Sequence, residues 1–357
     1  MNLMPIWCKG LSPELRKKAE VTLGERSNVQ AKALVDFRRL INAQQDIYSR
    51  LDDVFLLRFL RTKKYNLQKA FKLYLNYYSF KQKGTFTGMR PSDMKRVIQM
   101  NNILYSPYRT PCGSHVAIYR LGAFDVSTAT YEEMISTILL VGEMILDCEA
   151  TQVCGGIVIV DLADMSLQHY RQFLTVNFIS FIINLLQDCI PERIKDIHFV
   201  NEPYLFHVSY NVVKPIVKKK LKDRLHFHGS NMNSLHCYVP KECLPKELGG
   251  KLGKFNNKEF AEYFYSQEAF IERINKYGII EKKPALNIEK KPASNIEKKP
   301  ASNIEKKPAS NIEKKTASNI EKKTASNIEK KPASNIEKKT ASNIEKKTTS
   351  KINNNRQ

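Results

Sequence analysis

The stretch from Gly155 to Gly229 constrains the fold of this chain most, because short apolar segments alternate in it with apolar helical segments. Three runs are rich in β-branched or aromatic residues and end at turn formers or prolines, which is typical of strands: 156–161, 194–200 and 224–229. Between the first two, residues 173–186 (FLTVNFISFIINLL) predict a helix that is apolar nearly all round. Such a helix is hidden on every side or contacts something apolar that is not protein. Strands joined by right-handed helical crossovers form a mainly parallel sheet, so we predict an α/β fold.

The residues before this stretch predict a small all-α unit and then the first strand. Four helices are expected in the first 85 residues, near 12–25, 28–46, 52–61 and 66–78. Ser12 and Pro13 supply the cap and the first position of the first helix. A further helix is expected at 91–100 and the first strand at 116–121. Thr130 and Glu133 form a capping box for a helix that runs to about Glu149.

Two more helices are expected after the strand at 194–200. The first begins after Pro203, and its apolar residues fall three or four apart: Leu205, Val208, Val212 and Ile216. Pro215 lies inside this helix and should kink or divide it, because proline removes a backbone hydrogen bond. Asn256 or Asn257 caps a final helix that packs back on the fold.

The C-terminal part of the chain is an octad repeat. From Glu281 to Ile352 nine units such as EKKPASNI follow one another, and five of them contain proline. An eight-residue period moves the isoleucine of each unit about 80° around a helix, so the isoleucines form no apolar stripe. We therefore predict a disordered tail at 281–357, after an N-terminal helical domain at 1–90 and an α/β domain at 91–280.

Net charge points to an acidic partner surface. The tail holds 20 Lys or Arg and 9 Glu, a balance of +11, so the other +11 of the total +22 belongs to residues 1–280. Such a surface could be anionic lipid headgroups or nucleic acid.

Seven cysteines without a Cys-x-x-Cys pair fit a reduced, intracellular protein. No run reaches about 18 apolar residues, so we expect a cytoplasmic chain that lies on a membrane without crossing it.

Motifs of catalysis are missing from the sequence, so we do not expect an enzyme or a cofactor. A phosphate loop, a dinucleotide fingerprint and a nucleophile elbow are all absent, and 249–254 is better explained as a tight turn. A zinc site is the weaker explanation of His226 and His228, with His236, Cys237 and Cys243 nearby, because no matching pair of ligands is spaced for it. We therefore predict no metal. Asp161 and Asp164 are expected to cap the next helix rather than to act as a catalytic pair.

Apolar helices beside basic residues suggest a pocket with a charged mouth. The helices at 135–146, 173–186 and 205–217 present large apolar faces to one sheet, which fits an ordinary core as well as a ligand cavity. Neighbouring cations favour the cavity. Arg193 and Lys195 alternate along a strand, and Lys220 and Arg224 share a helix face if that helix extends so far.

Four ordered segments within about residues 10–275 resemble the CRAL-TRIO lipid-transfer family. They are DDVFLLRFLR with KKY at 52–65, IHFVNEP at 197–203, VKP at 213–215 with RLHFHG at 224–229, and LPKELGG at 244–250. Asp164 and Ser230 depart from the family pattern, which usually has Gly and Asn there. The resemblance implies a helical N-terminal domain and an α/β domain that holds one lipophilic molecule under a mobile helical gate. It also implies that Arg193, Lys195, Lys220 and Arg224 contact phosphoinositide phosphates, as in the tocopherol-binding branch.

We therefore predict a monomeric carrier that binds a small lipophilic ligand, of tocopherol, retinoid or phospholipid type, and exchanges it at phosphoinositide-bearing membranes. The alternative is a phosphoinositide sensor that transfers no cargo. Nucleic acid is not the expected partner of the folded part. The predicted pocket residues, each of which fits a plain core equally well, are Ile138, Ile145, Ile159, Phe173, Phe178, Phe181, Ile182 and Phe199. The predicted gate residues are Leu205, Phe206, Val208, Val212, Val213 and Ile216.

Overall fold

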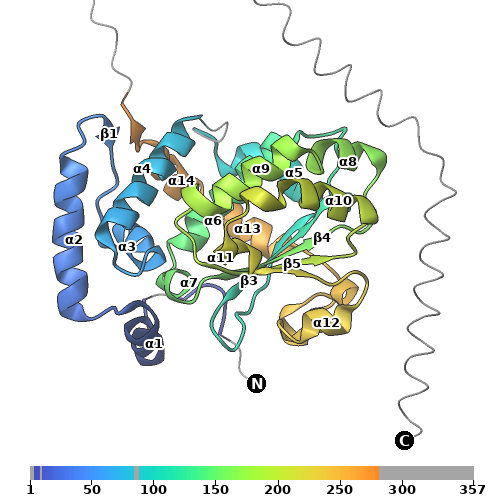
Figure 1. Ribbon diagram of the computed structural model, residues 1–357, viewed down its shortest axis with the longest axis horizontal. Helices are drawn as coiled ribbons and strands as arrows, with labels where there is room; N and C mark the ends of the chain where they lie inside the picture. Colours follow the sequence, from blue (N-terminus) through green and yellow to red (C-terminus); the bar gives the residue numbers. More distant parts are fainter. Residues whose placement is uncertain (1–3, 9, 84–87, 281–357) are drawn as a thin grey trace, which may run out of the picture. The chain divides into compact units, whose positions relative to one another are not determined.

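A five-stranded sheet forms the centre of the computed structural model, which describes residues 4–8, 10–83 and 88–280 (Figure 1). Its strand order is β2 (Ile103–Tyr105), β3 (His115–Arg120), β4 (Gly156–Asp161), β5 (Ile194–Val200) and β6 (Leu225–Phe227). Strand β2 is antiparallel to β3, and the other neighbours are parallel. The mainly parallel sheet of the prediction is confirmed, but β3 is not the first strand of this sheet, because the three-residue β2 precedes it.

Both faces of the sheet are covered, which explains the continuous apolar runs of β4 and β5. Ile157 and Ile159 of β4 pack on the face that lies under α12 (Met232–His236). Val158 and Val160 point to the other face, under α9 (Val176–Asn184) and α10 (Tyr204–Val213). Figure 1 shows α12 on one side of the sheet and α9 with α10 on the other.

The N-terminal part consists of four helices, as predicted: α1 (Pro13–Leu23), α2 (Ser27–Asn42), α3 (Asp53–Thr62) and α4 (Leu67–Lys83). The Ser12 hydroxyl accepts from Leu15 N at 3.3 Å and caps α1, and Asp52 caps α3. Aromatic rings fill the space between α2, α3 and α4, with Phe59 against Tyr74 at a centroid distance of 5.6 Å. Strands β1 (Ile47–Tyr48) and β7 (Gly278–Ile279) pair and join this part to the end of the fold.

Two fully buried arginines of α3 dock the helical part onto α6 (Tyr131–Leu146) and α7 (Glu149–Cys154). Arg58 Nη1 lies 2.8 Å from Glu143 Oε2, and Arg58 Nη2 lies 3.2 Å from Asp147 Oδ1. Arg61 pairs with Glu25 at 2.7 Å and with Glu149 at 2.9 Å. The described residues accordingly belong to one compact unit. The domain boundary at residue 90 stays a prediction.

The remaining helices follow the predicted order with different ends. After a 3-10 turn, α5 (Lys95–Gln99) leads to β2, and the Thr130–Glu133 capping box opens α6 as predicted. The helix expected at 173–186 begins later, as α9, because the Thr175 hydroxyl accepts from Phe178 N at 3.2 Å and caps it there, and a separate helix, α8 (Leu167–Phe173), precedes it. Pro215 ends α10 in a 3-10 turn before α11 (Lys219–Lys222), and the expected final helix is divided into α13 (Lys258–Ser266) and α14 (Glu268–Asn275).

The loop after β4 explains one departure from the family pattern. Asp164 has φ 60°, the left-handed region that glycine adopts most easily. Asp161 accepts hydrogen bonds from Ala163 N at 3.0 Å and from Asn201 Nδ2 at 2.8 Å, so its carboxylate holds the loop.

Two sequence predictions concern membranes and the tail. Within residues 4–8, 10–83 and 88–280, no helix is both long and apolar enough to cross a bilayer. The predicted disordered tail at 281–357 lies outside the described residues.

Candidate functional site

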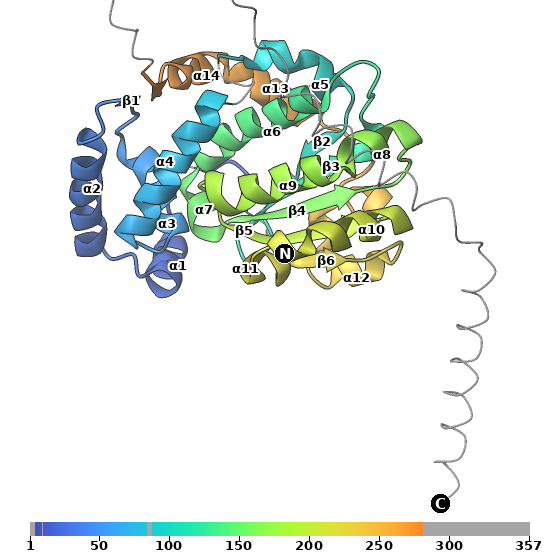
Figure 2. The same ribbon diagram turned by 45° about the horizontal axis from the view of Figure 1, so that its top comes forward.

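An apolar cavity of about 230 Å³ lies between the sheet and the helices that cover it. Figure 2 shows α9 and α10 side by side in front of β4 and β5. Val158 and Val160 of β4 and Ile197 of β5 form its floor, and α6, α9 and α10 form its walls. Its lining is aliphatic and aromatic, with Tyr119 and Tyr210 as the side chains that carry a hydroxyl. Such a cavity favours an apolar occupant.

Five of the eight predicted pocket residues line this cavity: Ile138, Phe173, Phe178, Ile182 and Phe199. The other three predicted residues do not line it. Ile145 is buried in the core that α6 shares with α13 and α14. Ile159 faces the opposite side of the sheet, since alternate residues of a strand point to opposite faces. Phe181 is 38% exposed and packs on Phe80 at 5.9 Å instead.

The predicted gate residues of α10 and of the turn after it fall into two groups, one buried and one exposed. Phe206 lines the cavity, and Val213 is buried in the cluster that includes Val158, Val160 and Ile197 of the cavity floor. The other four are about half exposed, namely Leu205, Val208, Val212 and Ile216, and Tyr204 is 80% exposed. These four therefore form an outer apolar surface rather than the cavity wall. Whether α10 moves as a gate stays a prediction.

A second cavity, of about 530 Å³, is basic. It contains all four predicted phosphate-binding residues and three further cations: Lys63, Lys64, Arg193, Lys195, Lys218, Lys220 and Arg224. The structure corrects the reason for their closeness. Arg193 precedes β5, and Arg224 follows the end of α11, so tertiary packing rather than a shared strand or helix face brings them together.

The positive charge of this basic cavity is largely uncompensated. Among the described cations that line it, only Lys218 forms an ion pair, with Asp188 at 2.6 Å. Burial, and then repulsion from Arg193, lower the pKa of Lys195. Burial and repulsion from Arg224 likewise lower the pKa of Lys220. A multiply charged anion would relieve this repulsion, because opposite charges favour the protonated cations.

Two of the three further cations come from the helical part of the chain. Lys63 and Lys64 lie in the turn after α3, where Lys64 has φ 49°. The signal was present, since the KKY segment was among the family-like motifs. Its role depends on the docking of α3 against α6 and α7, which no local pattern specifies.

The basic cavity and the apolar cavity share a wall. Four residues line both of them: Leu186, Ile190, Ile194 and Leu221. A charged group bound by the cations would therefore lie next to an apolar group in the neighbouring cavity.

Comparison with known proteins identifies the family. The CRAL/TRIO domain matches residues 99–250. The alpha-tocopherol transfer protein-like protein of Mus musculus is 32% identical over 275 residues, which cover 75% of this chain and 79% of that protein. The chain belongs to the CRAL/TRIO family. Clavesin-1 of Xenopus laevis is 31% identical over 252 residues, which cover 69% of this chain and 76% of the relative.

Members of the CRAL/TRIO family bind and transfer lipids, and such homologues are carriers rather than enzymes. Among solved structures, the crystal structure of Sfh5 is similar with a TM-score of 0.45 and 11% identity, over 74% of this chain and 99% of that one. A similarity this weak carries no argument.

Glu192 makes the stability of this CRAL/TRIO protein depend on pH. It lines the basic cavity, and burial raises its pKa to about 7. His115 Nε2 lies 3.3 Å from Glu192 Oε1. Burial and repulsion from Arg109 lower the pKa of His115 to about 3, so the imidazole is neutral and does not stabilise a charged Glu192. An unfolded glutamate titrates near its ordinary pKa of 4.5. The folded chain therefore holds an extra proton between these values and loses stability as pH rises through this window.

We expect Glu192→Gln to flatten this pH dependence. Urea unfolding of the wild type and of Glu192→Gln, measured at intervals from about pH 5 to about pH 8, checks it, because glutamine cannot ionise. Glu259→Gln is the control, since Glu259 is exposed and far along the chain from this cavity. An unchanged slope in Glu192→Gln would show that another group controls the pH dependence.

His226 and His228, which were weighed as zinc ligands, form hydrogen bonds with neighbouring side chains. His198 Nδ1 lies 2.9 Å from His228 Nε2, and His226 Nε2 lies 2.9 Å from Asp196 Oδ1. Their rings stack on the face of the sheet opposite the apolar cavity, next to Tyr238. In the part of the chain that the structure describes, no three His, Cys, Asp or Glu side chains converge as metal ligands.

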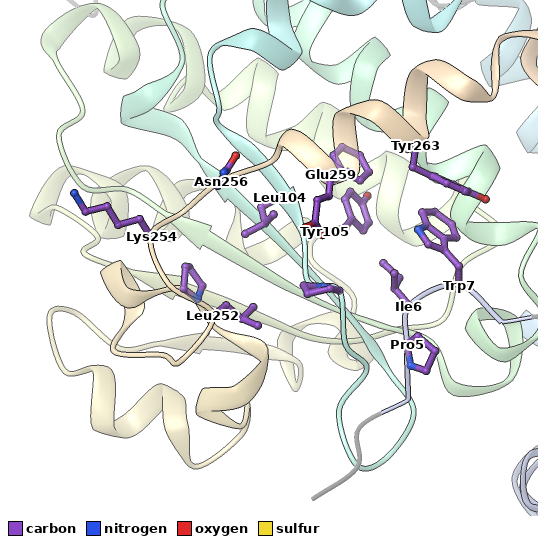
Figure 3. Close-up of a pocket in the computed structure, with 13 residues that line it drawn as sticks. Pro5, Ile6, Trp7, Leu104, Tyr105, Leu252, Lys254, Asn256, Glu259 and Tyr263 are labelled. Atoms are coloured by element: carbon purple, nitrogen blue, oxygen red, sulfur yellow. The ribbon is translucent and has the colours of Figure 1, made fainter.

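A third cavity, of about 630 Å³, lies away from these residues, between the N-terminal segment, β2 and α13 (Figure 3). Aromatic and proline side chains line much of it, with Glu259 and Lys254 among the polar ones. No motif of the sequence points to it.

Proposed function

We propose that this CRAL/TRIO protein is an intracellular lipid carrier that takes up one lipophilic molecule in the apolar cavity and exchanges it at phosphoinositide-bearing membranes. The observation that carries the proposal is the wall that the apolar and basic cavities share. A membrane headgroup held by the cations would place the bilayer surface beside the entrance of the cavity. The names of the relatives support the same class of cargo, since one is alpha-tocopherol transfer protein-like.

Loading requires the cavity to widen. Its volume of about 230 Å³ is below the roughly 300–1,000 Å³ that is usual for pockets of drug-sized ligands. Outward movement of α9 and α10 enlarges it at least cost, because both helices already expose apolar side chains, such as Val176 and Val212, to solvent. Inserting this exposed surface into a membrane interface offsets the lost packing.

The energies involved suit reversible exchange. Burial of apolar ligand surface contributes roughly 25 cal/mol per Å². Each basic residue near an anionic bilayer contributes about 1 kcal/mol, so four contribute about 4 kcal/mol, enough for docking that salt can reverse.

Extraction of the purified protein followed by mass spectrometry tests the carrier directly. We expect a stoichiometric apolar molecule in the wild type. Ile182→Trp should lower its occupancy at least several-fold, because Ile182 lines the cavity and the larger ring fills it. Phe181→Trp, on the same helix but outside the lining, is the matched control and should leave occupancy unchanged. Equal occupancy in both variants would place the ligand elsewhere.

The small cavity also favours a second candidate, a phosphoinositide sensor that transfers no cargo. In that case extraction yields no stoichiometric ligand, while liposome binding through the basic cavity persists. A fluorescent lipid-transfer assay between two vesicle populations separates the candidates, because only a carrier accelerates transfer.

A further inference from the structure

Two thiols from distant parts of the chain meet beneath α1. Cys8 lies in the N-terminal segment, Cys148 lies at the start of α7, and their Sγ atoms are 3.5 Å apart. Both belong to the apolar cluster that α1 forms with α7. A disulfide has an S–S length of about 2.0 Å, so a shift of roughly 1.5 Å would join them.

Backbone hydrogen bonds hold Cys8 in this position. Ile6 N donates to Pro107 O at 2.8 Å, and Arg109 N donates to Met4 O at 2.7 Å. Trp7 stacks on Tyr263 with a centroid distance of 4.0 Å, and Figure 3 shows the two rings side by side. The fold itself therefore holds the two thiols close together.

Arg109 supplies a charge that favours a thiolate at Cys148. Its side chain is fully buried, and it donates to Ile6 O at 3.1 Å, to Thr151 Oγ1 at 2.9 Å and to Cys148 Sγ at 3.3 Å. Among the described residues no carboxylate forms an ion pair with it. A buried guanidinium without a counter-charge is costly, and a thiolate at Cys148 would provide one.

The two thiols differ in acidity, with Cys148 buried against Arg109 and Cys8 half-buried. Burial opposes ionisation of Cys148, but the Arg109 charge brings the pKa of this thiol below its ordinary value. Burial and the neighbouring Cys148 raise the pKa of Cys8 to about 11. A thiolate is the form that attacks oxidants, and a nearby thiol can then resolve the product.

We propose that Cys148 and Cys8 form a peroxide-sensitive thiol pair that closes to a disulfide. The Cys148 thiolate attacks one oxygen of a hydroperoxide, the O–O bond breaks, and the leaving oxygen takes a proton to give water or an alcohol. The Cys8 thiol then attacks the sulfenic sulfur, the S–O bond breaks, and the hydroxyl leaves with the Cys8 proton as water. Two thiols are oxidised and one peroxide is reduced. A thiol reductant reverses the reaction by disulfide exchange.

Formation of the Cys8–Cys148 disulfide would fix one wall of the third cavity. Pro5, Ile6 and Trp7 line that cavity and immediately precede Cys8, so the disulfide ties this wall to α7. Oxidation would thereby control access to a site separate from the proposed lipid cavity.

Treatment of the full chain with hydrogen peroxide, followed by peptide mass spectrometry without reduction, tests the pair. A protease that cleaves after acidic residues is suitable, because Asp147 and Glu149 flank Cys148 and separate it from Cys154. We expect one Cys8–Cys148 linked peptide, which disappears in Cys8→Ser and in Cys148→Ser. Cys112→Ser and Cys237→Ser should retain it, since these cysteines are exposed and distant in sequence from the pair.

The protein contains a single tryptophan, Trp7, which reports the change without any substitution. We expect iodide quenching of its fluorescence to fall on oxidation and to recover with dithiothreitol. The proposal is overturned if Cys8 and Cys148 stay in separate peptides while Cys112 and Cys237 oxidise. It is equally overturned if the linkage forms but Trp7 quenching is the same in both redox states, because oxidation then leaves the Pro5–Trp7 wall of the third cavity unchanged.

Discussion

Replacing Arg58 by methionine is expected to lower the free energy of unfolding by about 3–5 kcal/mol. The side chain is fully buried between α3 and α6 and pairs with Glu143 and Asp147. Burial opposes ionisation of Glu143, but the charges of Arg58 and Lys81 keep its pKa below the ordinary value. Methionine keeps most of the length but leaves the Glu143 carboxylate buried without its partner. Urea unfolding followed by circular dichroism measures the loss.

Two further variants test whether the unpaired carboxylate of Glu143 causes this loss of stability. Adding Glu143→Leu to Arg58→Met should recover part of the stability, because the uncompensated carboxylate is then gone, although Tyr77 loses its 2.7 Å acceptor. Arg39→Ala is the control, because Arg39 is 78% exposed and its pair with Asp36 contributes only about 0–1 kcal/mol. Similar losses in Arg58→Met and Arg39→Ala would show that the buried pair does not hold the helical part on the α/β part.

The second large effect is expected on membrane binding. The double variant Arg193→Ala and Lys220→Ala removes two of the seven cations of the basic cavity. At about 1 kcal/mol per basic residue, the loss is about 2 kcal/mol, or roughly 30-fold in the dissociation constant for liposomes that contain phosphoinositides. Cosedimentation with vesicles of matched surface charge, with and without phosphoinositide, measures it at two salt concentrations.

A control of equal charge separates the cavity from net charge. Lys219→Ala with Lys246→Ala also removes two positive charges, but neither residue lines the basic cavity. This control should weaken binding much less, and equally for all anionic vesicles. If both double variants lose the same affinity, the protein senses net surface charge and the cavity is not a headgroup site.

Much of the fold was predictable from local patterns. The apolar runs of β4 and β5 and the Thr130–Glu133 box at the start of α6 depend on residues within a few positions of each other, and the structure has all three. Short β2 was missed, because three residues carry too little pattern. The break between α8 and α9 is not apparent from the apolar pattern either, since Thr175 fits one more position of an apolar helix as well as the cap that it is.

The site was predictable in part. The four expected cations lie in one cavity, yet Lys63 and Lys64 were not assigned to it, because they reach it from another part of the chain. In β4 the choice between Ile159 and its neighbours Val158 and Val160 could not be made from the sequence. A strand that is apolar on both faces gives no sign of which face borders a cavity.

The kinds of elements, their order, the family and the excess of positive charge can be inferred from the amino-acid sequence, because each is encoded in neighbouring residues or in composition. Three contacts are evident only in the folded chain: the wall shared by the apolar and basic cavities, the burial of Arg58 against Glu143, and the position of Cys8 beside Cys148. These contacts join residues far apart in the chain. Their positions follow from how the helices pack on the sheet, a balance of burial and shape that no local pattern contains.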